Sequence, residues 1–335
     1  MKKIFLFVIV TIMLITIVAC GNQGSTDENL YGSNLLETGS EQARLYTAIH
    51  KKIAEVSRGN ATSTVFIFEK FKMDSDINQF SKNLKKVLGL LWASCPFDMY
   101  WYEEESGYIV QGDPDGDCIT FTVKFPVAKD FRGINKYEVN PSSKSVVLEA
   151  ARYADSIVES AIGTDAEKIR YFRDRICALA EYDHETYNAY LTGEIKCGNK
   201  PWQMISVFDQ DPTTKVICGG YSKAFKYLCD KAGIQCILIN GDMIIGDGNP
   251  IAHLWNVVTL NGKNYIVDIT NCDDGELGYP NKLLLAGATG NVTDGYTTNV
   301  GITYRYYYTE YGGKTDMRIL YGDDALTIAT TAYPG

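Results

Sequence analysis

The sequence predicts an α+β fold, with a small N-terminal unit ahead of a larger one. In several segments apolar residues recur at helical spacing, whereas aromatic and β-branched runs bounded by turn residues are typical of antiparallel strands. A hydrophobic content of 45% is that of a packed globular protein. The polar segment 139–145 separates the first group of helices and strands from the second. We therefore expect two units, which span residues 41–140 and 141–335.

The beginning of the chain has the pattern of an export signal. A positively charged start precedes an uncharged apolar run over residues 4–19, which matches a signal peptide and is short for a membrane-spanning helix. An uncleaved anchor helix is the alternative. The run ends in "IVAC", which resembles the lipobox of bacterial lipoproteins, and this resemblance implies that residues 1–19 are removed and that Cys20 carries lipid. Residues 20–40 are polar and predict a flexible tether, so we expect an exported protein held by lipid at the outer face of the bacterial cell membrane.

The composition argues against several classes of function. A net charge of −9 makes nucleic acid a poor partner, and removal of the leader would make the chain more acidic. The three histidines are too few for a histidine-rich metal site, and because no CxxC or zinc spacing occurs we expect neither metal nor cofactor. Nine cysteines do not make a disulfide scaffold at this length. Without Cys20 and Cys218 their number is odd, so at least one is a free thiol or pairs outside the chain.

The first unit is predicted to contain two helices and an antiparallel sheet. Helical spacing covers residues 41–57 and 76–93, and strand-like runs cover 97–103, 107–112 and 117–127. Nothing in this unit has a catalytic pattern.

The segment "GDPDGD" at 112–117 alternates aspartates as a calcium loop does. Lys124 stands where such a loop needs a glutamate, so a polar hairpin turn is the better interpretation.

The second unit begins with two predicted helices, 143–161 and 165–181, of which the second starts at a Thr164 cap. Further along, "CGGYSKAFKYLCDKAGI" carries apolar residues at helical spacing, which puts Cys218 in the first turn of a helix. A helix N-terminus favours a thiolate over a thiol, and the two glycines after Cys218 leave room for a substrate backbone. A buried structural cysteine is the alternative interpretation.

Three strand-like runs follow, at 235–240, 252–260 and 263–270, and the last two predict a hairpin. Asn-Gly at 261–262 is a strong signal for a two-residue turn, and this turn sets Trp255 opposite Asp268. His253 shares the face of Trp255, so His253 and Asp268 become diagonal neighbours within reach of a hydrogen bond. A core histidine and a strand-end carboxylate are the structural alternatives.

A cysteine at a helix start, a histidine on a strand and an aspartate on the next strand are the parts of a thiol nucleophile system. Cys218 would be the nucleophile, His253 its base and Asp268 the group that orients the imidazole. In order and spacing, "CGGYS", "HLW" and "DIT" resemble the motifs of the transglutaminase-like superfamily, as do "FRDRICALAEYD" and "KAGI". The resemblance covers about residues 165–290. It implies a papain-like α+β fold, in which the cysteine helix packs on an antiparallel sheet, and acyl transfer through a thioester.

The resemblance has a departure and an open point. Gly219 follows the cysteine where many bacterial members carry an acidic or polar residue. The Cys218 N–H is one natural oxyanion donor, and by analogy with related thiol enzymes Trp202 or Gln203 is a candidate for the second.

The expected function is cysteine-dependent hydrolysis of amide bonds in a peptide or protein substrate at the bacterial surface. A protein-crosslinking transamidase and a non-catalytic module that binds peptide or glycan remain open alternatives, and the sequence does not set the oligomeric state. His50 and His184 have no partner pattern and are expected at the surface. The acidic run 272–276 is expected to be a solvated loop, and the aromatic run 304–311 is expected in the core or on the sheet surface.

Overall fold

The computed structural model describes residues 31–334 apart from 195–203, 274, 276 and 311–312. The expected lipid site Cys20 and the oxyanion candidates Trp202 and Gln203 lie outside the described residues. In the part of the chain that is described, no helix is long and apolar enough to cross a membrane.

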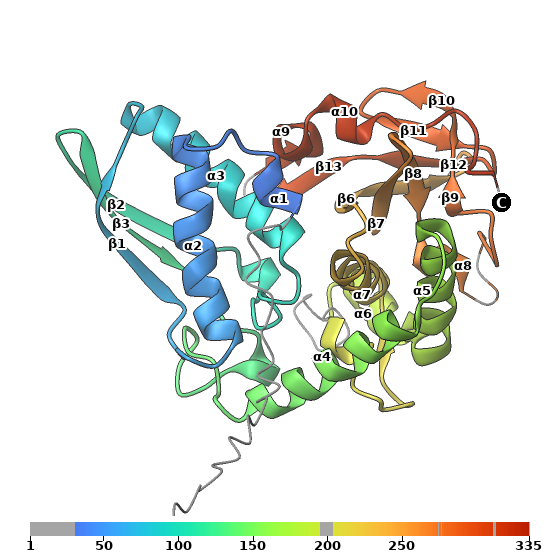
Figure 1. Ribbon diagram of the computed structural model, residues 1–335, viewed down its shortest axis with the longest axis horizontal. Coiled ribbons are helices and arrows are strands. Elements are labelled where there is room, and N and C mark those ends of the chain that lie inside the picture. The colour runs from blue at the N-terminus through green and yellow to red at the C-terminus, as the bar shows by residue number, and fades with distance from the viewer. Residues whose placement is uncertain (1–30, 195–203, 274, 276, 311–312, 335) are drawn as a thin grey trace, which may run out of the picture.

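The first unit has two main helices and a three-stranded sheet of order β1-β3-β2, all antiparallel. In Figure 1 this sheet lies at one end of the molecule, and α2 and α3 lie between it and the larger unit. The prediction of both helices is confirmed, because each begins at a capping side chain, Ser40 for α2 and Asp76 for α3. The elements are α1 Tyr31–Asn34, α2 Glu41–Ser57, β1 Val65–Lys72, α3 Ile77–Ser94, η1 Glu104–Ser106, β2 Ile109–Asp115, β3 Cys118–Lys124 and η2 Lys129–Phe131.

One predicted strand of this sheet is wrong. Residues 97–103 form turns with a single bridge from Tyr102 to Val127, and the third strand is β1, which the sequence pattern did not indicate. Tyr100, Trp101 and Tyr102 are all buried in succession, whereas a strand buries alternate side chains. The tertiary packing of these rings, edge-on to Phe125 for Trp101 and Tyr102, therefore decides the backbone path.

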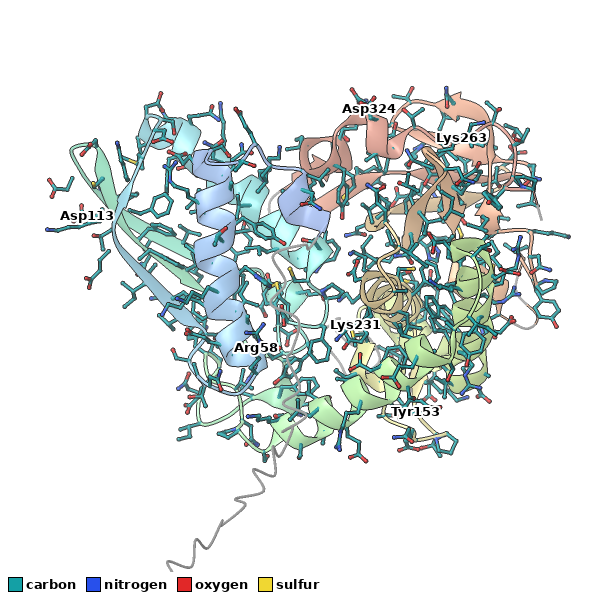
Figure 2. All side chains as sticks on the ribbon, in the orientation of Figure 1. Arg58, Asp113, Tyr153, Lys231, Lys263 and Asp324 are labelled. Atoms are coloured by element: carbon teal, nitrogen blue, oxygen red, sulfur yellow. The ribbon has the colours of Figure 1, made fainter. Side chains whose placement is uncertain are left out.

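The hairpin turn expected at 112–117 is present but shorter, because residues 112–115 belong to β2 and only residues 116 and 117 form the turn. Asp115 pairs with Cys118, and Gly116 between them has a φ of 63°, which suits glycine. Asp113 is exposed and its side chain points away from the protein near the end of this hairpin (Figure 2). The described residues contain no group of three His, Cys, Asp or Glu side chains that could hold a metal ion.

The larger unit is built on a seven-stranded antiparallel sheet of order β10-β11-β12-β6-β7-β8-β9. The strands expected from the sequence form its centre as β6 Cys236–Ile245, β7 Ile251–Leu260 and β8 Lys263–Val267. The remaining strands are β9 Leu284–Ala286, β10 Ala288–Val292, β11 Gly295–Thr298 and β12 Ile302–Arg305. Small two-stranded pairs are β4 Glu181–Tyr182 with β5 Lys215–Val216, and β13 Tyr307–Glu310 with β14 Gly313–Asp316.

Helix α7, Cys218–Lys231, packs on β6 and β7 and is covered by α4 and α5 on its other side (Figure 1). The predicted α+β fold is therefore confirmed, with the cysteine helix packed on an antiparallel sheet. The predicted helices before it are present as α4 Ser143–Ser160 and α5 Asp165–Leu179, and Thr164 with Glu167 forms a full capping box. The other helices are α6 His184–Leu191, η4 Met204–Ser206, α8 Ile269–Cys272, α9 Met317–Tyr321 and α10 Asp323–Leu326.

The two predicted units share a buried core. One cluster of buried apolar side chains includes residues of both units. It also includes Leu36, so the end of the segment 20–40, which was expected to be a flexible tether, packs on the core. At the join, the Lys223 ammonium of α7 contacts the Glu104 carboxylate, and the rings of Phe97 and Tyr227 stack with centroids 4.9 Å apart. The domain bounds at residues 140 and 141 remain a prediction from the pattern of elements.

Candidate active site

Cys218 is the first residue of α7, as the spacing predicts. Ile217 precedes it as an extended N-cap residue whose side chain makes no capping bond, so the first N–H groups of the helix have no side-chain acceptor there. The Cys218 side chain is almost fully buried, with 5% of the residue exposed. The nucleophile candidate therefore lies at a helix N-terminus, where backbone N–H groups favour a negative charge.

The hairpin that carries His253 and Asp268 has the expected turn. Leu260 pairs with Lys263, and Asn261 and Gly262 have φ of 51° and 73°, as a type I′ turn requires.

The end of the second strand differs from the expectation. Strand β8 stops at Val267, so the predicted pairing of Trp255 with Asp268 does not form. Asp268 is instead the N-cap of α8 and accepts a hydrogen bond from the N–H of Asn271 at 3.2 Å, because aspartate is a strong capping residue. His253 and Asp268 nevertheless meet, with 2.9 Å between Nε2 and Oδ2.

Asp268 is completely buried and is held as a carboxylate by several donors. The Tyr304 hydroxyl donates to its Oδ2 at 2.6 Å, and the Asn271 amide donates to the same oxygen at 2.7 Å. Burial alone would raise the pKa of Asp268, but the charge of His253 and these hydrogen bonds outweigh it and hold the pKa below its ordinary value. The ring of His253 is thus fixed from behind by an ionised group.

His253 is held as a cation between Asp268 and Cys218. Burial favours the neutral imidazole, but the Asp268 charge, the hydrogen bond to Asp268 and a hydrogen bond with Cys218 raise the pKa of His253 to about 10. Because Nε2 faces Asp268, Nδ1 is the nitrogen that remains for the thiol. The structure therefore brings Cys218, His253 and Asp268 into one connected chain of side chains.

Aromatic rings support this chain, and the sequence pattern did not assign them a place in the site. Trp255 is stacked with His253 at a centroid distance of 6.2 Å and an interplanar angle of 12°, and its Nε1 donates to the Tyr296 hydroxyl at 2.6 Å. Tyr304 lies 4.8 Å from the Trp255 ring. Tyr304 belongs to the run 304–311, which was expected in the core or on the sheet surface. It is fully buried, and the aromatic density of that run was the only sequence signal for it.

A cavity of about 160 Å³ opens beside His253. Among the residues that the structure describes, no Asp, Glu, Lys or Arg lines it, and the hydroxyl of Thr270 is buried there without a hydrogen-bond partner from the described residues. Two expected surface features border the site: His184 is exposed and lines the cavity, and Asp273 of the acidic run accepts a hydrogen bond from the Tyr221 hydroxyl at 2.6 Å. The lining residues are Tyr182, His184, Tyr187, Met243, Ile245, Ile251, Ala252, His253, Thr270, Asn271 and Leu277.

Comparisons with known proteins give partial matches. No family model matches the chain. The mouse protein named kyphoscoliosis peptidase is 26% identical over 151 residues, which are 42% of this chain and 21% of that protein. Its human counterpart is 29% identical over 117 residues, which are 32% of this chain and 16% of that protein. The chain thus spans about a fifth of the length of these curated relatives.

The solved structures that it resembles overlap with it loosely. One described as a TGase is 15% identical with a TM-score of 0.34, and the match covers 62% of this chain and 50% of that one. A candidate protease from Parabacteroides distasonis is 11% identical with a TM-score of 0.27, over 61% and 41% of the two chains. A candidate cysteine protease from Cytophaga hutchinsonii is 12% identical with a TM-score of 0.26, over 63% and 72%.

Proposed function

We propose that this chain, which resembles the transglutaminase-like superfamily in fold and in the order of its motifs, is a cysteine hydrolase that cleaves amide bonds in peptides or proteins. The observation that carries the proposal is the connected chain Cys218–His253–Asp268 at the start of a buried helix. The curated relatives are named as peptidases, which supports an enzyme of this class. We place the reaction at the bacterial cell surface on the basis of the leader and of Cys20.

The reaction begins with attack of the Cys218 thiolate on the carbonyl carbon of the substrate. The oxyanion forms at the N-terminus of α7, where the Cys218 N–H can donate to it. The His253 imidazolium then gives its proton to the leaving amine, and a thioester remains on Cys218. Neutral His253 next takes a proton from water, and the resulting hydroxide attacks the thioester carbon, so that the carboxylic acid product leaves and the Cys218 thiolate is restored. Asp268 keeps the ring in position through both steps.

The cavity beside His253 indicates what the substrate presents there. Since the described residues of its wall are mainly apolar and aromatic and include no Asp, Glu, Lys or Arg, an uncharged apolar side chain of the peptide fits the part of the cavity away from His253. The unpartnered Thr270 hydroxyl is then available for one hydrogen bond with the substrate backbone. Ile245 and Leu277 at its border are 39% and 47% exposed, which extends the apolar surface outward.

The test of the reaction is mass spectrometry of the intact protein after exposure to a peptide library, with and without an added primary amine. An acyl adduct should appear on Cys218 and disappear in Cys218→Ala, while Cys118→Ala, which removes a partly exposed thiol of the first unit, should keep it. Free acids as products support hydrolysis, and amine-linked products indicate a transamidase instead. If wild type forms no adduct and Cys218 reacts with iodoacetamide no faster than Cys118, the hydrolase proposal is wrong and a binding module explains the fold better.

The test of the cavity is a charge substitution at its border. Leu277→Asp puts a carboxylate beside the apolar wall, so cleavage should shift away from apolar and towards basic side chains at the position that enters the cavity. Leu148→Asp changes a similarly exposed leucine on α4 and should leave the preference unchanged. An unchanged preference in Leu277→Asp would contradict the assignment of this cavity without touching the reaction at Cys218.

A further inference from the structure

A second cysteine, histidine and aspartate meet in the first unit, away from Cys218. His50 lies on α2, Cys95 ends α3 and Asp98 follows in the next turn. The Nε2 of His50 is 2.8 Å from the Oδ2 of Asp98, and the Cys95 side chain forms a hydrogen bond with His50. The expectation that His50 lies at the surface without a partner is therefore wrong, because packing of α2 against α3 brings these side chains together.

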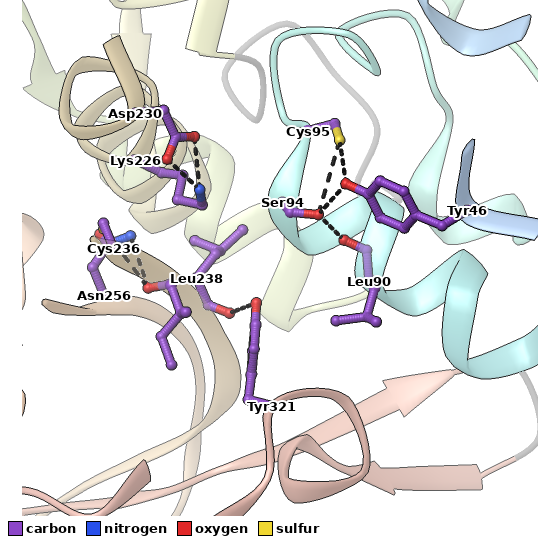
Figure 3. Close-up of polar contacts among 11 residues, drawn as sticks. Tyr46, Leu90, Ser94, Cys95, Lys226, Asp230, Cys236, Leu238, Asn256 and Tyr321 are labelled. Carbon is purple, nitrogen blue, oxygen red and sulfur yellow. Dashed lines mark hydrogen bonds and ion pairs between the residues drawn. The ribbon is translucent and has the colours of Figure 1, made fainter. Parts of the chain in front are cut away.

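Hydroxyl groups surround the sulfur of Cys95 (Figure 3). The Tyr46 hydroxyl is 3.3 Å from its Sγ, and the Ser94 hydroxyl is 3.8 Å from it. Tyr46 lies one helical turn before His50 on α2, and its ring stacks on the imidazole with centroids 5.9 Å apart. The Ser94 hydroxyl donates its proton to the Leu90 carbonyl, so the Tyr46 hydroxyl is the one of these two groups that can donate to the sulfur, and a cysteine in an apolar core has no such donor.

Two cationic groups act on this sulfur. Burial alone would lower the pKa of His50, but hydrogen bonds with Asp98 and Cys95 raise it to about 10, so the ring is an imidazolium at neutral pH. Across the join between the units, Lys226 is buried and paired at 2.6 Å with both oxygens of Asp230, and Cys95 contributes to raising its pKa (Figure 3). Each of these two cations is paired with a carboxylate, His50 with Asp98 and Lys226 with Asp230.

Access to Cys95 is narrow. The residue is 3% exposed, whereas the side chains of His50 and Asp98 are 13% and 12% exposed. A sulfur that is this enclosed excludes a peptide substrate, and we expect a reagent of only a few atoms to reach it, from the side of the more exposed His50. The site therefore selects its reagent by size.

We propose that Cys95 is a second reactive thiol of this protein, a site that small hydroperoxides oxidise to a sulfenic acid. The thiolate attacks the terminal oxygen of the hydroperoxide, an S–O bond forms and the O–O bond breaks. Sulfur is oxidised by two electrons and the peroxide is reduced. The departing hydroxide or alkoxide takes a proton from the His50 imidazolium and leaves as water or an alcohol. Asp98 acts through His50, as a positioning residue that keeps the ring charged and oriented.

Other cysteines in the described residues lack this environment. Burial raises the pKa of Cys229 and of Cys272 far above the ordinary value, and both thiols are thereby kept protonated. Burial, together with Asp273, raises the pKa of Cys177 to about 12. They are thiols of the same chain without an imidazolium partner, and they serve as internal controls.

The experiment uses the full-length Cys218→Ala protein, so that its result does not depend on the proposed hydrolase. The protein is treated with limiting hydrogen peroxide, and portions are unfolded in dimedone at set times, so that the trap reaches every sulfenic acid that has formed. The dimedone occupancy of each cysteine is then measured by peptide mass spectrometry. Cys95 should be trapped at least on the order of tenfold faster than Cys229 or Cys272. A Cys95 rate equal to theirs would overturn the proposal.

Two variants test the roles of the partners. His50→Gln and Asp98→Asn should each slow trapping at Cys95 by on the order of tenfold, while trapping at Cys229 and Cys272 stays constant. If a variant only loosens the fold, all buried cysteines become more reactive together, and this common rise separates a structural role from a chemical one. Cys95 trapping that is as fast in both variants as in their parent would refute the part assigned to His50 and Asp98.

Discussion

Asp268 concentrates the polar contacts of the candidate active site in one residue. It has no exposed surface, and it binds His253 on one side and Tyr304 and Asn271 on the other. A carboxylate so enclosed is stable only because each partner donates to it, so loss of one donor is felt by the whole site. Substitutions of Asp268 or of its partners should therefore affect the whole site.

Substitutions of the three central residues should differ in severity. Cys218→Ala should abolish turnover, because no other group forms the thioester, and His253→Ala should nearly do so, because it handles both protons. Asp268→Asn should lower kcat/KM by roughly 10²–10³, less than in serine enzymes, because a thiol needs less help to ionise. The measurement is kcat/KM on a peptide identified from the library, with circular dichroism as the control for folding. Full activity in Cys218→Ala would exclude the acyl-enzyme.

Tyr304→Phe removes the hydroxyl that donates a hydrogen bond to the Asp268 carboxylate and leaves the ring in place. We expect kcat/KM to fall roughly tenfold, the equivalent of about 1.4 kcal/mol, since a hydrogen bond to a charged group is worth about 1.5–3 kcal/mol. Tyr333→Phe is the matched control, because that hydroxyl accepts a bond from Asn261 at the distant hairpin turn. Equal rates for the two variants would show that Tyr304 has no part in orienting Asp268.

The stability of the folded protein should decrease as the pH becomes alkaline, because two histidines lose their protons. Folding raises the pKa of His253 and of His50 from 6.5 to about 10, so each contributes stability that is complete below pH 6.5 and is lost as the pH rises through about 10. The melting temperature of wild type should therefore fall between these values, less steeply in His253→Gln or His50→Gln, and least in the double variant. If the melting temperature of the double variant falls with pH as steeply as that of wild type, the raised pKa values of the two histidines are contradicted.

Strands and turns show which parts of this fold are encoded locally. The hairpin at 261–262 was predicted from the sequence because a type I′ turn depends on two adjacent residues. A strand was predicted wrongly at 97–103, because rings that are distant in the sequence decide how that segment is buried. Strand β1 was missed, because Ile67 is 57% exposed and the alternation of buried apolar and exposed polar residues is therefore unclear there. Tyr304 reaches Asp268 only through the sheet order β12-β6-β7, and nothing local in the sequence determines that order.

Gly262→Ala tests the turn that sets the distance between His253 and Asp268. The backbone φ is 73° and no atom crowds the position, so the cost comes from the backbone alone and should be about 1–2 kcal/mol in the free energy of unfolding. Gly290→Ala is the control, since that glycine has equal space without a positive φ and should change stability by less than about 0.5 kcal/mol. Denaturant titration measures both, and equal values would argue against a strained turn.

At the scale of the whole molecule, the two predicted units form a joint core around the cysteine helix. Both reactive-thiol candidates are close to α7: Cys218 is its first residue, and Cys95 of the first unit lies near Lys226 further along the helix. The sequence predicted the first of these groupings, because its residues fall into three ordered motifs. It could not predict the second, because His50 and Cys95 are brought together only by the packing of α2 on α3.

The leader makes a prediction for the whole chain. Mature protein should begin at Cys20 and carry the mass of attached lipid, and Cys20→Ala should release or mislocalise it while leaving iodoacetamide labelling at Cys218 unchanged. Fractionation and N-terminal mass spectrometry are the measurements. A mature chain that starts elsewhere and carries no lipid would rule out this anchoring.

The hydrogen bond from Tyr304 to Asp268 affects when the candidate site is completed during synthesis of the chain. Chains are made from the N-terminus, so Cys218, His253 and Asp268 all emerge well before Tyr304 does. Until β12 joins β6, the carboxylate lacks one of its donors and the imidazole lacks a firmly held partner. In a nascent chain the candidate nucleophile is therefore in an unfinished setting, and we expect the site to be complete only after residue 304 has been synthesised and β12 has joined β6.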